Sequence, residues 1–196
     1  MTAEAAPQLE HYRVDAAAST LTVQAFAGGL LSAFGHDPLF RVDDFSGEAE
    51  FVPGTFENAA LKVVIKANSL FVTNVKEKDR QEIEGTMRNE VLETRKYPEI
   101  VFESHNISLR RIGAGRYRAR VIGDLTLHGV TQRNIWIDGE VIAASAGELR
   151  AKGQWQIKQT DYRIKLVSVA GGTLKIKNEV KCSFDVRYTL AMSDMF

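Results

Sequence analysis

The sequence has little cysteine, little proline and no excess of charge. Its 196 residues include one cysteine and four prolines, and 25 Lys plus Arg balance 25 Asp plus Glu. One thiol cannot form an intrachain disulfide or a multi-thiolate metal site, so core burial must stabilise the fold. A neutral chain also lacks the overall positive field that favours nucleic acid or an anionic bilayer. We therefore expect no nucleic-acid partner and no metal or other cofactor.

Long hydrophobic runs and a targeting segment are also missing. No uninterrupted apolar run reaches the roughly 18 residues that a membrane helix needs. The first residues, 1–11, lack the basic start and apolar stretch of a signal peptide. We expect a cytoplasmic protein with no stable membrane insertion, built as one domain over 12–191 with a lead-in at 1–11 and a tail at 192–196. A transmembrane β-barrel is disfavoured because its export would need a signal peptide.

Apolar and polar residues alternate along most of the chain. From Leu174 to Leu190 every even position is apolar except Asn178. Similar long stretches cover 116–128 and 149–158, and shorter ones lie at 21–25, 49–51, 61–67, 100–102 and 135–141. Because side chains two residues apart share one face of a strand, each stretch predicts a strand with one buried face.

About eight strands follow from this pattern, some far longer than the usual 5–6 residues. Long strands must coil, and closing the sheet removes exposed edges. We expect an all-β fold, an extended antiparallel eight-stranded barrel with its apolar face inward. That face carries small residues among large ones, which favours a cavity, although a single strand glycine more often marks a bend. The small residues are Ala49, Ala67, Ala119, Gly123, Gly139, Ala151 and Gly153.

One charged segment, about 75–95, breaks the alternation. Ile83, Met87 and Val91 are spaced four apart, which predicts a short helical segment with a narrow apolar side. We expect Gly85 to interrupt or end a first helix, and Pro98 to stop the helical region. The segment is expected to lie near the barrel opening.

Three motifs resemble the YceI-like family of polyisoprenoid-binding proteins. They are the run GDLTLHGVT at 123–131, the segment KYPEIVFES at 96–104 and the pair Asp79-Arg80. The resemblance extends over most of the chain and implies a lipocalin-like barrel whose apolar tunnel holds a long isoprenoid chain, with a helix beside the opening. The chain departs from the family pattern at Val91-Leu92 and at Gln159 and Arg163, which bears on the identity of the ligand more than on the fold.

Alternation and helical spacing together name the residues expected to line the tunnel. They are Leu21, Val23, Ala49, Phe51, Leu61, Val63, Ile65, Ile83, Met87, Phe102, Tyr117, Val121, Leu125, Trp155, Ile157, Ile176 and Val180. The candidates for contact with a polar head group are His36, Asp37, Lys78, Arg80 and Arg163.

The leading hypothesis is non-enzymatic binding, storage or transport of a long-chain isoprenoid amphiphile, a polyprenyl phosphate or an isoprenoid quinone. Burial of one five-carbon unit gives roughly 3–4 kcal/mol, and association costs on the order of 4–15 kcal/mol. A tail of several units can therefore be held without polar contacts, whereas a short one cannot.

Two alternatives remain. The first is a lipid-acting hydrolase or isomerase that uses His36 and Asp37, although no metalloprotease, nucleophile-elbow, phosphate-loop or dinucleotide motif is found. The second is a structural or interaction module with an incidental cavity, and a homodimer would fit a neutral chain with strand edges. We expect His128 to stabilise the turn that follows it, and Cys182 to be a small core residue.

Overall fold

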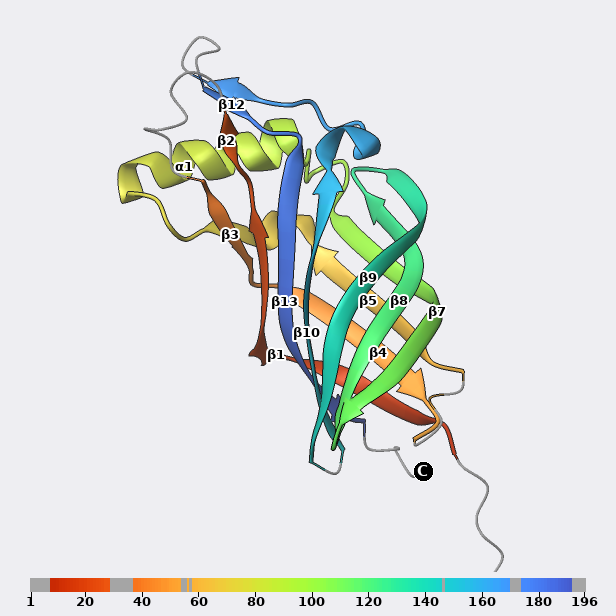
Figure 1. The fold of residues 1–196 in the computed structure, drawn as a ribbon. Coiled ribbons are helices and arrows are strands. Elements are labelled where there is room, and N and C mark those ends of the chain that lie inside the picture. Colours follow the sequence, from red (N-terminus) through yellow and green to blue (C-terminus); the bar gives the residue numbers. More distant parts are fainter. Residues whose placement is uncertain are drawn as a thin grey trace, which may run out of the picture.

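The protein forms a closed antiparallel barrel (Figure 1). The computed structural model describes residues 8–28, 37–53, 56, 58–145, 147–169 and 174–191. Within these residues eight strands close in the order β1, β4, β5, β7, β8, β9, β10, β13 and back to β1. Their bounds are β1 Glu10–Gln24, β4 Phe45–Phe51, β5 Ala60–Lys66, β7 Glu99–Gly113, β8 Arg116–Leu127, β9 Val130–Ser145, β10 Glu148–Lys158 and β13 Glu179–Leu190.

Shorter elements complete one end of the barrel, the upper end in Figure 1. Strand β3 (Leu39–Val42) pairs with the C-terminal part of β1, and β6 (Leu70–Val72) pairs with β3. A small sheet joins β11 (Ser168–Val169), β12 (Leu174–Ile176) and β2 (Ala27–Gly28). Three helical pieces are η1 (Ala67–Ser69), α1 with its continuation η2, described below, and η3 (Gln159–Tyr162).

Strand β1 turns a corner at residues 16–19. The pairing between β1 and β13 shifts there, from Asp15 opposite Arg187 to Thr20 opposite Asp185. The hydroxyl of Ser19 fills the gap, because it donates to the Asp15 carbonyl at 2.6 Å and accepts from the Arg187 N–H at 2.9 Å. Such a bulge lets one strand pair with β4 along its first part and with β3 along its last.

The alternating stretch at the C-terminus is two strands, so the prediction of one unbroken strand is wrong. Asn178 leaves the ladder to bind the η3 turn: its Oδ1 accepts from the Thr160 N–H at 3.0 Å, and its Nδ2 donates to the Thr160 hydroxyl at 2.8 Å. The Gln159 N–H also donates to the Asn178 carbonyl at 2.9 Å. The one polar residue on the apolar face therefore marks the break between β12 and β13.

The predicted helical segment is helix α1 (Glu77–Thr86), continued by a π-helical turn η2 (Met87–Val91). The expectation that Gly85 ends or interrupts the helix is wrong, since the helix runs through it. A Cβ at this position would meet nothing within 4 Å, so the glycine serves no close packing contact. The change of helical pitch comes two residues later, at Met87.

Two strand glycines allow close packing and open no space. A Cβ on Gly123 would lie 2.7 Å from Cζ of Phe102 and against the carbonyl oxygen of Glu103. On Gly153 it would lie 2.6 Å from Cζ of Phe184 and 2.7 Å from the Asp138 carbonyl oxygen. Both glycines therefore let the tips of aromatic rings approach the strands closely, as expected where a strand glycine marks close approach to the backbone.

Candidate functional site

An internal cavity of about 680 Å³ runs along the barrel, within the size range of ligand sites in proteins. Nearly every residue predicted to line a tunnel faces it, and of the predicted small residues Ala49, Ala119, Gly139 and Ala151 do so as well. The predicted residues that line it are Leu21, Val23, Ala49, Phe51, Leu61, Val63, Ile65, Ile83, Met87, Phe102, Val121, Leu125, Trp155, Ile157, Ile176 and Val180.

Tyr117 is the predicted residue that does not line the cavity. Its ring packs edge-on against Phe56, with ring centroids 5.0 Å apart. Phe56 in turn contacts Phe51, which stacks on Tyr12 with centroids 4.9 Å apart. These four rings join β1, β4 and β8 near the end of the barrel that lies away from helix α1 (Figure 1). Tyr117 thus belongs to an aromatic cluster at that end.

Several lining residues were missed by the sequence prediction. Ile137, Leu149 and Tyr188 lie on alternating stretches, so the same pattern identifies them. Phe40 and Phe45 were missed because they flank two consecutive aspartates, where the alternation is too short to read.

The deep part of the cavity offers little reactive chemistry. Cys182 lines it opposite Trp155 on the neighbouring strand, and burial raises the pKa of its thiol to about 12. Tyr188 also lines it, and burial raises the pKa of its hydroxyl. Both groups therefore stay protonated at neutral pH and act as apolar or weakly polar walls.

Helix α1 and its π turn cover the upper end of the cavity. Ile83, Met87 and Val91 point into it, while Asp79 and Glu82 lie on its rim. Glu82 is exposed to solvent, so the cavity reaches the surface beside α1.

Neither Lys78 nor Arg80, both predicted to contact a head group, lines the cavity. Lys78 is exposed, and Arg80 pairs with Glu77 at 3.0 Å. The helical phase explains this, since Asp79, Ile83 and Met87 are spaced four apart and share the inward face.

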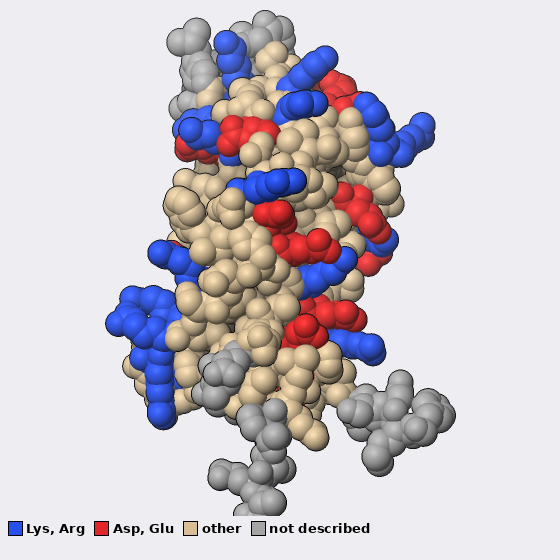
Figure 2. Space-filling view, turned by 90° about the vertical axis from the view of Figure 1, so that its right-hand side faces the viewer, with Lys and Arg blue, Asp and Glu red and all other residues tan. Residues whose placement is uncertain are grey.

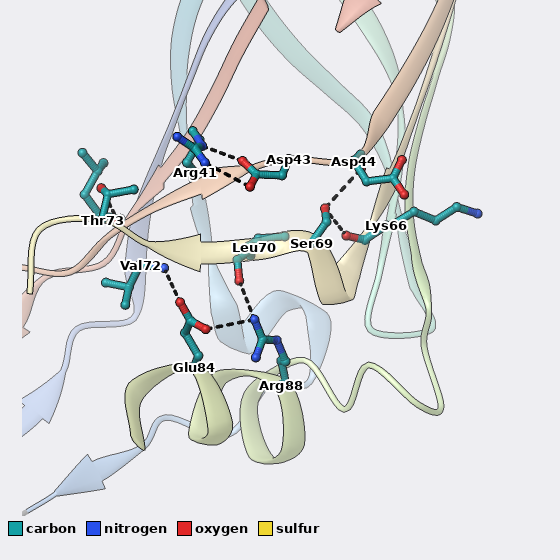
Figure 3. Close-up of polar contacts among 11 residues, drawn as sticks. Arg41, Asp43, Asp44, Lys66, Ser69, Leu70, Val72, Thr73, Glu84 and Arg88 are labelled. Atoms are coloured by element: carbon teal, nitrogen blue, oxygen red, sulfur yellow. Dashed lines mark hydrogen bonds and ion pairs between the residues drawn. The ribbon is translucent and has the colours of Figure 1, made fainter. Parts of the chain in front are cut away.

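A buried ion pair fastens this helix to the edge of the sheet (Figure 3). Glu84 is 7% exposed, and its Oε1 accepts from the Val72 N–H of edge strand β6 at 3.0 Å. Its other oxygen lies 3.0 Å from Nη2 of Arg88, which also donates to the Leu70 carbonyl at 3.4 Å. The contacts use backbone groups that an edge strand leaves unpaired, so Glu84 and Arg88 position the cover of the cavity.

A second, polar pocket of about 500 Å³ adjoins the cavity. Its lining comes from the end of the π turn, the β8–β9 turn and the segment after η3: Asn89, Glu90, Glu93, His128, Arg163, Lys165, Leu166, Val167 and Ser168. Of the predicted head-group candidates, Arg163 lies here. The remaining polar lining was not predicted, because the three segments are far apart in the sequence.

His128 holds these three segments together. Its Nε2 lies 2.6 Å from a carboxylate oxygen of Glu93, and its Nδ1 lies 3.1 Å from the Tyr162 carbonyl oxygen. The Tyr97 ring covers it with centroids 4.5 Å apart. The expectation that His128 stabilises the turn that follows it is therefore corrected: its side-chain bonds go to two distant segments. Since both nitrogens are engaged, His128 has no free nitrogen to act as a base.

The wall between pocket and cavity has one apolar and one polar face. Leu127 and Ile164 line the cavity, whereas their neighbours His128, Arg163 and Lys165 face the pocket. Val167 lines both. An amphiphile could therefore place a tail on one side of Val167 and a polar group on the other.

Asp37 has a structural contact in the described part of the chain. Its Oδ1 accepts from the Ala27 N–H at 2.8 Å, and its carbonyl accepts from Asn74 Nδ2 at 2.8 Å. His36 lies outside the described residues. Among the residues the structure describes, no three His, Cys, Asp or Glu are placed to hold a metal, and no helix has the length and apolarity to span a bilayer.

The sequence profile of the YceI-like domain matches residues 12–188. The chain is 30% identical over 132 residues to a protein of Vibrio campbellii called UPF0312, and this match spans 65% of either protein.

Solved structures share the fold. A polyisoprenoid-binding domain from Saccharophagus degradans, implicated in plant cell wall breakdown, superposes with a TM-score of 0.66 at 21% identity, over 92% of this chain and 98% of that one. BcnA of Burkholderia cenocepacia superposes with a TM-score of 0.66 at 16% identity, over 89% of this chain and 98% of that one. The YCEI protein of Campylobacter jejuni superposes with a TM-score of 0.56 at 19% identity, over 78% of this chain and 84% of that one.

Proposed function

Because the chain belongs to the YceI-like domain family, we propose that it binds a long-chain isoprenoid amphiphile in its cavity and stores or carries it without catalysing a reaction. The ligand would be a polyprenyl phosphate or an isoprenoid quinone. The observation that supports this most is the cavity itself, an apolar bore that continues along the barrel and reaches the surface beside α1. The binding of a polyisoprenoid by the Saccharophagus relative points to the same ligand class.

The energetics agree with a long tail. Each buried methylene contributes about 0.8 kcal/mol, so several isoprene units offset an association cost of roughly 4–15 kcal/mol. The walls supply few hydrogen-bonding groups, and the tail would be recognised by shape and length. The specificity for the head group must then come from polar residues where the cavity opens or meets the polar pocket.

For the head group we propose the polar pocket around Arg163. Arg163 and Lys165 offer donors to a phosphate or carbonyl oxygen, and Val167 connects the pocket with the cavity. Lys78 and Arg80, on the helix at the other side of the entrance, are the next candidates. Asp37, before β3, and His36, outside the described residues, are further candidates.

The experiment is organic extraction of protein purified under native conditions, followed by mass spectrometry. We expect a co-purifying isoprenoid lipid. The variant Ala119→Phe adds bulk inside the cavity and should reduce lipid occupancy, while Ala17→Phe adds the same bulk on the exposed corner of β1 and should not. Thermal unfolding of both variants is the control that they are folded. Protein without extractable lipid that also fails to take up polyprenyl phosphates and quinones would refute the proposal.

A further inference from the structure

Basic side chains gather on two segments beside the polar pocket, and two of them, Arg163 and Lys165, line it. Residues 158–168 and 174–181 contain six Lys or Arg but two Asp or Glu. The two segments are joined by backbone hydrogen bonds, from Ile176 N–H to the Val167 carbonyl at 3.2 Å and from Gln159 N–H to the Asn178 carbonyl at 2.9 Å. We call this surface the entrance face, and its cations are Lys158, Arg163, Lys165, Lys175, Lys177 and Lys181.

The charge of the entrance face is poorly neutralised. On the barrel wall, Arg150, Arg120 and Arg116 each lie within 2.7 Å of a carboxylate on a neighbouring strand. In the part of the chain that the structure describes, no cation of the entrance face forms such a pair. Glu179 stands opposite Lys158 in the ladder, and Glu93 is engaged by His128. These two segments are therefore net positive on a chain whose total charge is zero, although Glu90 and Glu93 line the polar pocket beside Arg163 and Lys165.

The entrance face adjoins the cavity where Val167 and Ile176 line it. Ile176 lines the cavity, whereas its neighbours Lys175 and Lys177 point outward and are exposed. Next to Lys165, the side chain of Leu166 is 44% exposed and lines the polar pocket. An exposed leucine among lysines beside an apolar cavity is the combination that binds the interface of a bilayer.

We infer that the entrance face docks on an anionic lipid bilayer. The lysines contact lipid phosphates, and Leu166 enters the headgroup region. The neutral total charge argues against long-range attraction of the whole chain, but the field near a bilayer acts only over about a Debye length, so the local patch decides. Docking is peripheral and brings the cavity entrance to the membrane, where an amphiphile can pass between bilayer and protein.

A second basic group serves as a matched control. Arg110 and Arg118 stand directly opposite each other in the β7–β8 hairpin, which ends at the lower end of the barrel in Figure 1. Figure 2 shows Lys and Arg side chains projecting from the upper end of the molecule and gathered again at its lower left. The two ends therefore offer equal changes of charge at different places.

The test is co-sedimentation of the whole chain with vesicles of phosphatidylcholine, with and without phosphatidylglycerol. We expect binding to the anionic vesicles alone, lost at high salt. The double variant Lys175→Gln/Lys177→Gln should weaken it about tenfold or more, since each cation near the surface contributes appreciably. Lys175→Arg/Lys177→Arg and Arg110→Gln/Arg118→Gln should keep it, and Leu166→Ser should weaken it.

Three results would overturn the inference. They are no binding to anionic vesicles, equal binding by the Lys175→Gln/Lys177→Gln variant, and equal loss in the hairpin variant. A further result would contradict a bilayer partner: duplex DNA that competes for the protein as strongly as the vesicles do, together with no effect of Leu166→Ser. Such a result would indicate a general polyanion site. Extraction of lipid from the same preparations separates this inference from the proposed function, because docking can fail while the cavity is occupied, and the reverse.

Discussion

Nε2 of His128 lies 2.6 Å from Oε2 of Glu93, and the two residues are 35 positions apart in the sequence. With the bond from Nδ1 to the Tyr162 carbonyl, His128 ties the π turn and the η3 turn to the top of the barrel. Glu93 and His128 both have positive φ, 45° and 52°, conformations that non-glycine residues adopt at a cost. The contact therefore stabilises two unfavourable backbone conformations as well as the wall of the polar pocket.

Replacing this histidine should destabilise the protein. His128→Ala removes a charge-assisted bond and leaves the Glu93 carboxylate without its partner, so we expect the free energy of unfolding to fall by about 2–3 kcal/mol in chemical denaturation. His105→Ala is the control: its ring is 47% exposed and lies 3.5 Å from Asp124, and the loss should stay within about 0.5 kcal/mol. Equal effects of the two substitutions would show that the His128 contacts contribute little.

The buried carboxylate on α1 should control how fast a ligand leaves. Glu84→Leu removes the acceptor for the Val72 N–H and the partner of Arg88, so it should cost about 1–3 kcal/mol and loosen the helix over the cavity. We expect faster release of bound lipid in a stopped-flow exchange assay. Gln81→Leu, at an exposed position of the same helix, should leave the rate unchanged. A release rate for Glu84→Leu equal to that of the parent would mean that the ligand leaves elsewhere.

The single thiol should be unreactive in the folded protein. Cys182 is 7% exposed, and burial raises its pKa to about 12, so almost no thiolate exists at neutral pH. A disulfide reagent such as Ellman's should label it only after denaturation, which also gives the full-reaction control. Rapid labelling under native conditions would contradict the buried position.

An ion pair between β10 and β13 should stabilise the fold at pH values above the acidic range. Arg150, with a smaller contribution from burial in the opposite direction, holds the pKa of Asp185 below its usual 3.8. A lowered folded pKa adds stability above the unfolded value, and this is lost as pH falls through the folded value. Asp185→Asn should therefore lower the free energy of unfolding by up to about 1 kcal/mol at pH 7, and the difference from the parent should shrink as the pH falls below 3.8 and through the lowered pKa of Asp185. A constant difference at all pH values would assign the effect to packing.

Alternation predicted the barrel and most of the cavity lining because one face of every long strand looks inward. It failed at Tyr117, whose ring packs against Phe56 in an aromatic cluster at the lower end of the barrel and does not line the cavity. It also failed at Asn178, whose side chain replaces a ladder contact by bonds to Thr160. The single polar residue in an apolar row was the available signal.

The polar pocket could not be predicted in the same way. The contacts of His128 with Glu93 and Tyr162 depend on turns far apart in the chain, and two of these residues take conformations that sequence propensity disfavours. Arg163 was identified because it departs from the family pattern. Its pocket neighbours Glu90 and Lys165 belong to no sequence motif or periodic stretch that would identify them. The pairing of distant turns is a product of the closed barrel.

The most direct test of the account is the affinity for isoprenoid quinones of increasing chain length. In Trp136→Phe the exposed tryptophan is removed and Trp155, which lines the cavity, remains as the one reporter of a quenching quinone. We predict saturable quenching whose affinity rises with each added isoprene unit until the cavity is filled and then stays constant, with the plateau at shorter chains in Ala119→Phe. Affinity that is absent, or independent of both chain length and Ala119→Phe, would contradict the binding of an isoprenoid chain inside the barrel.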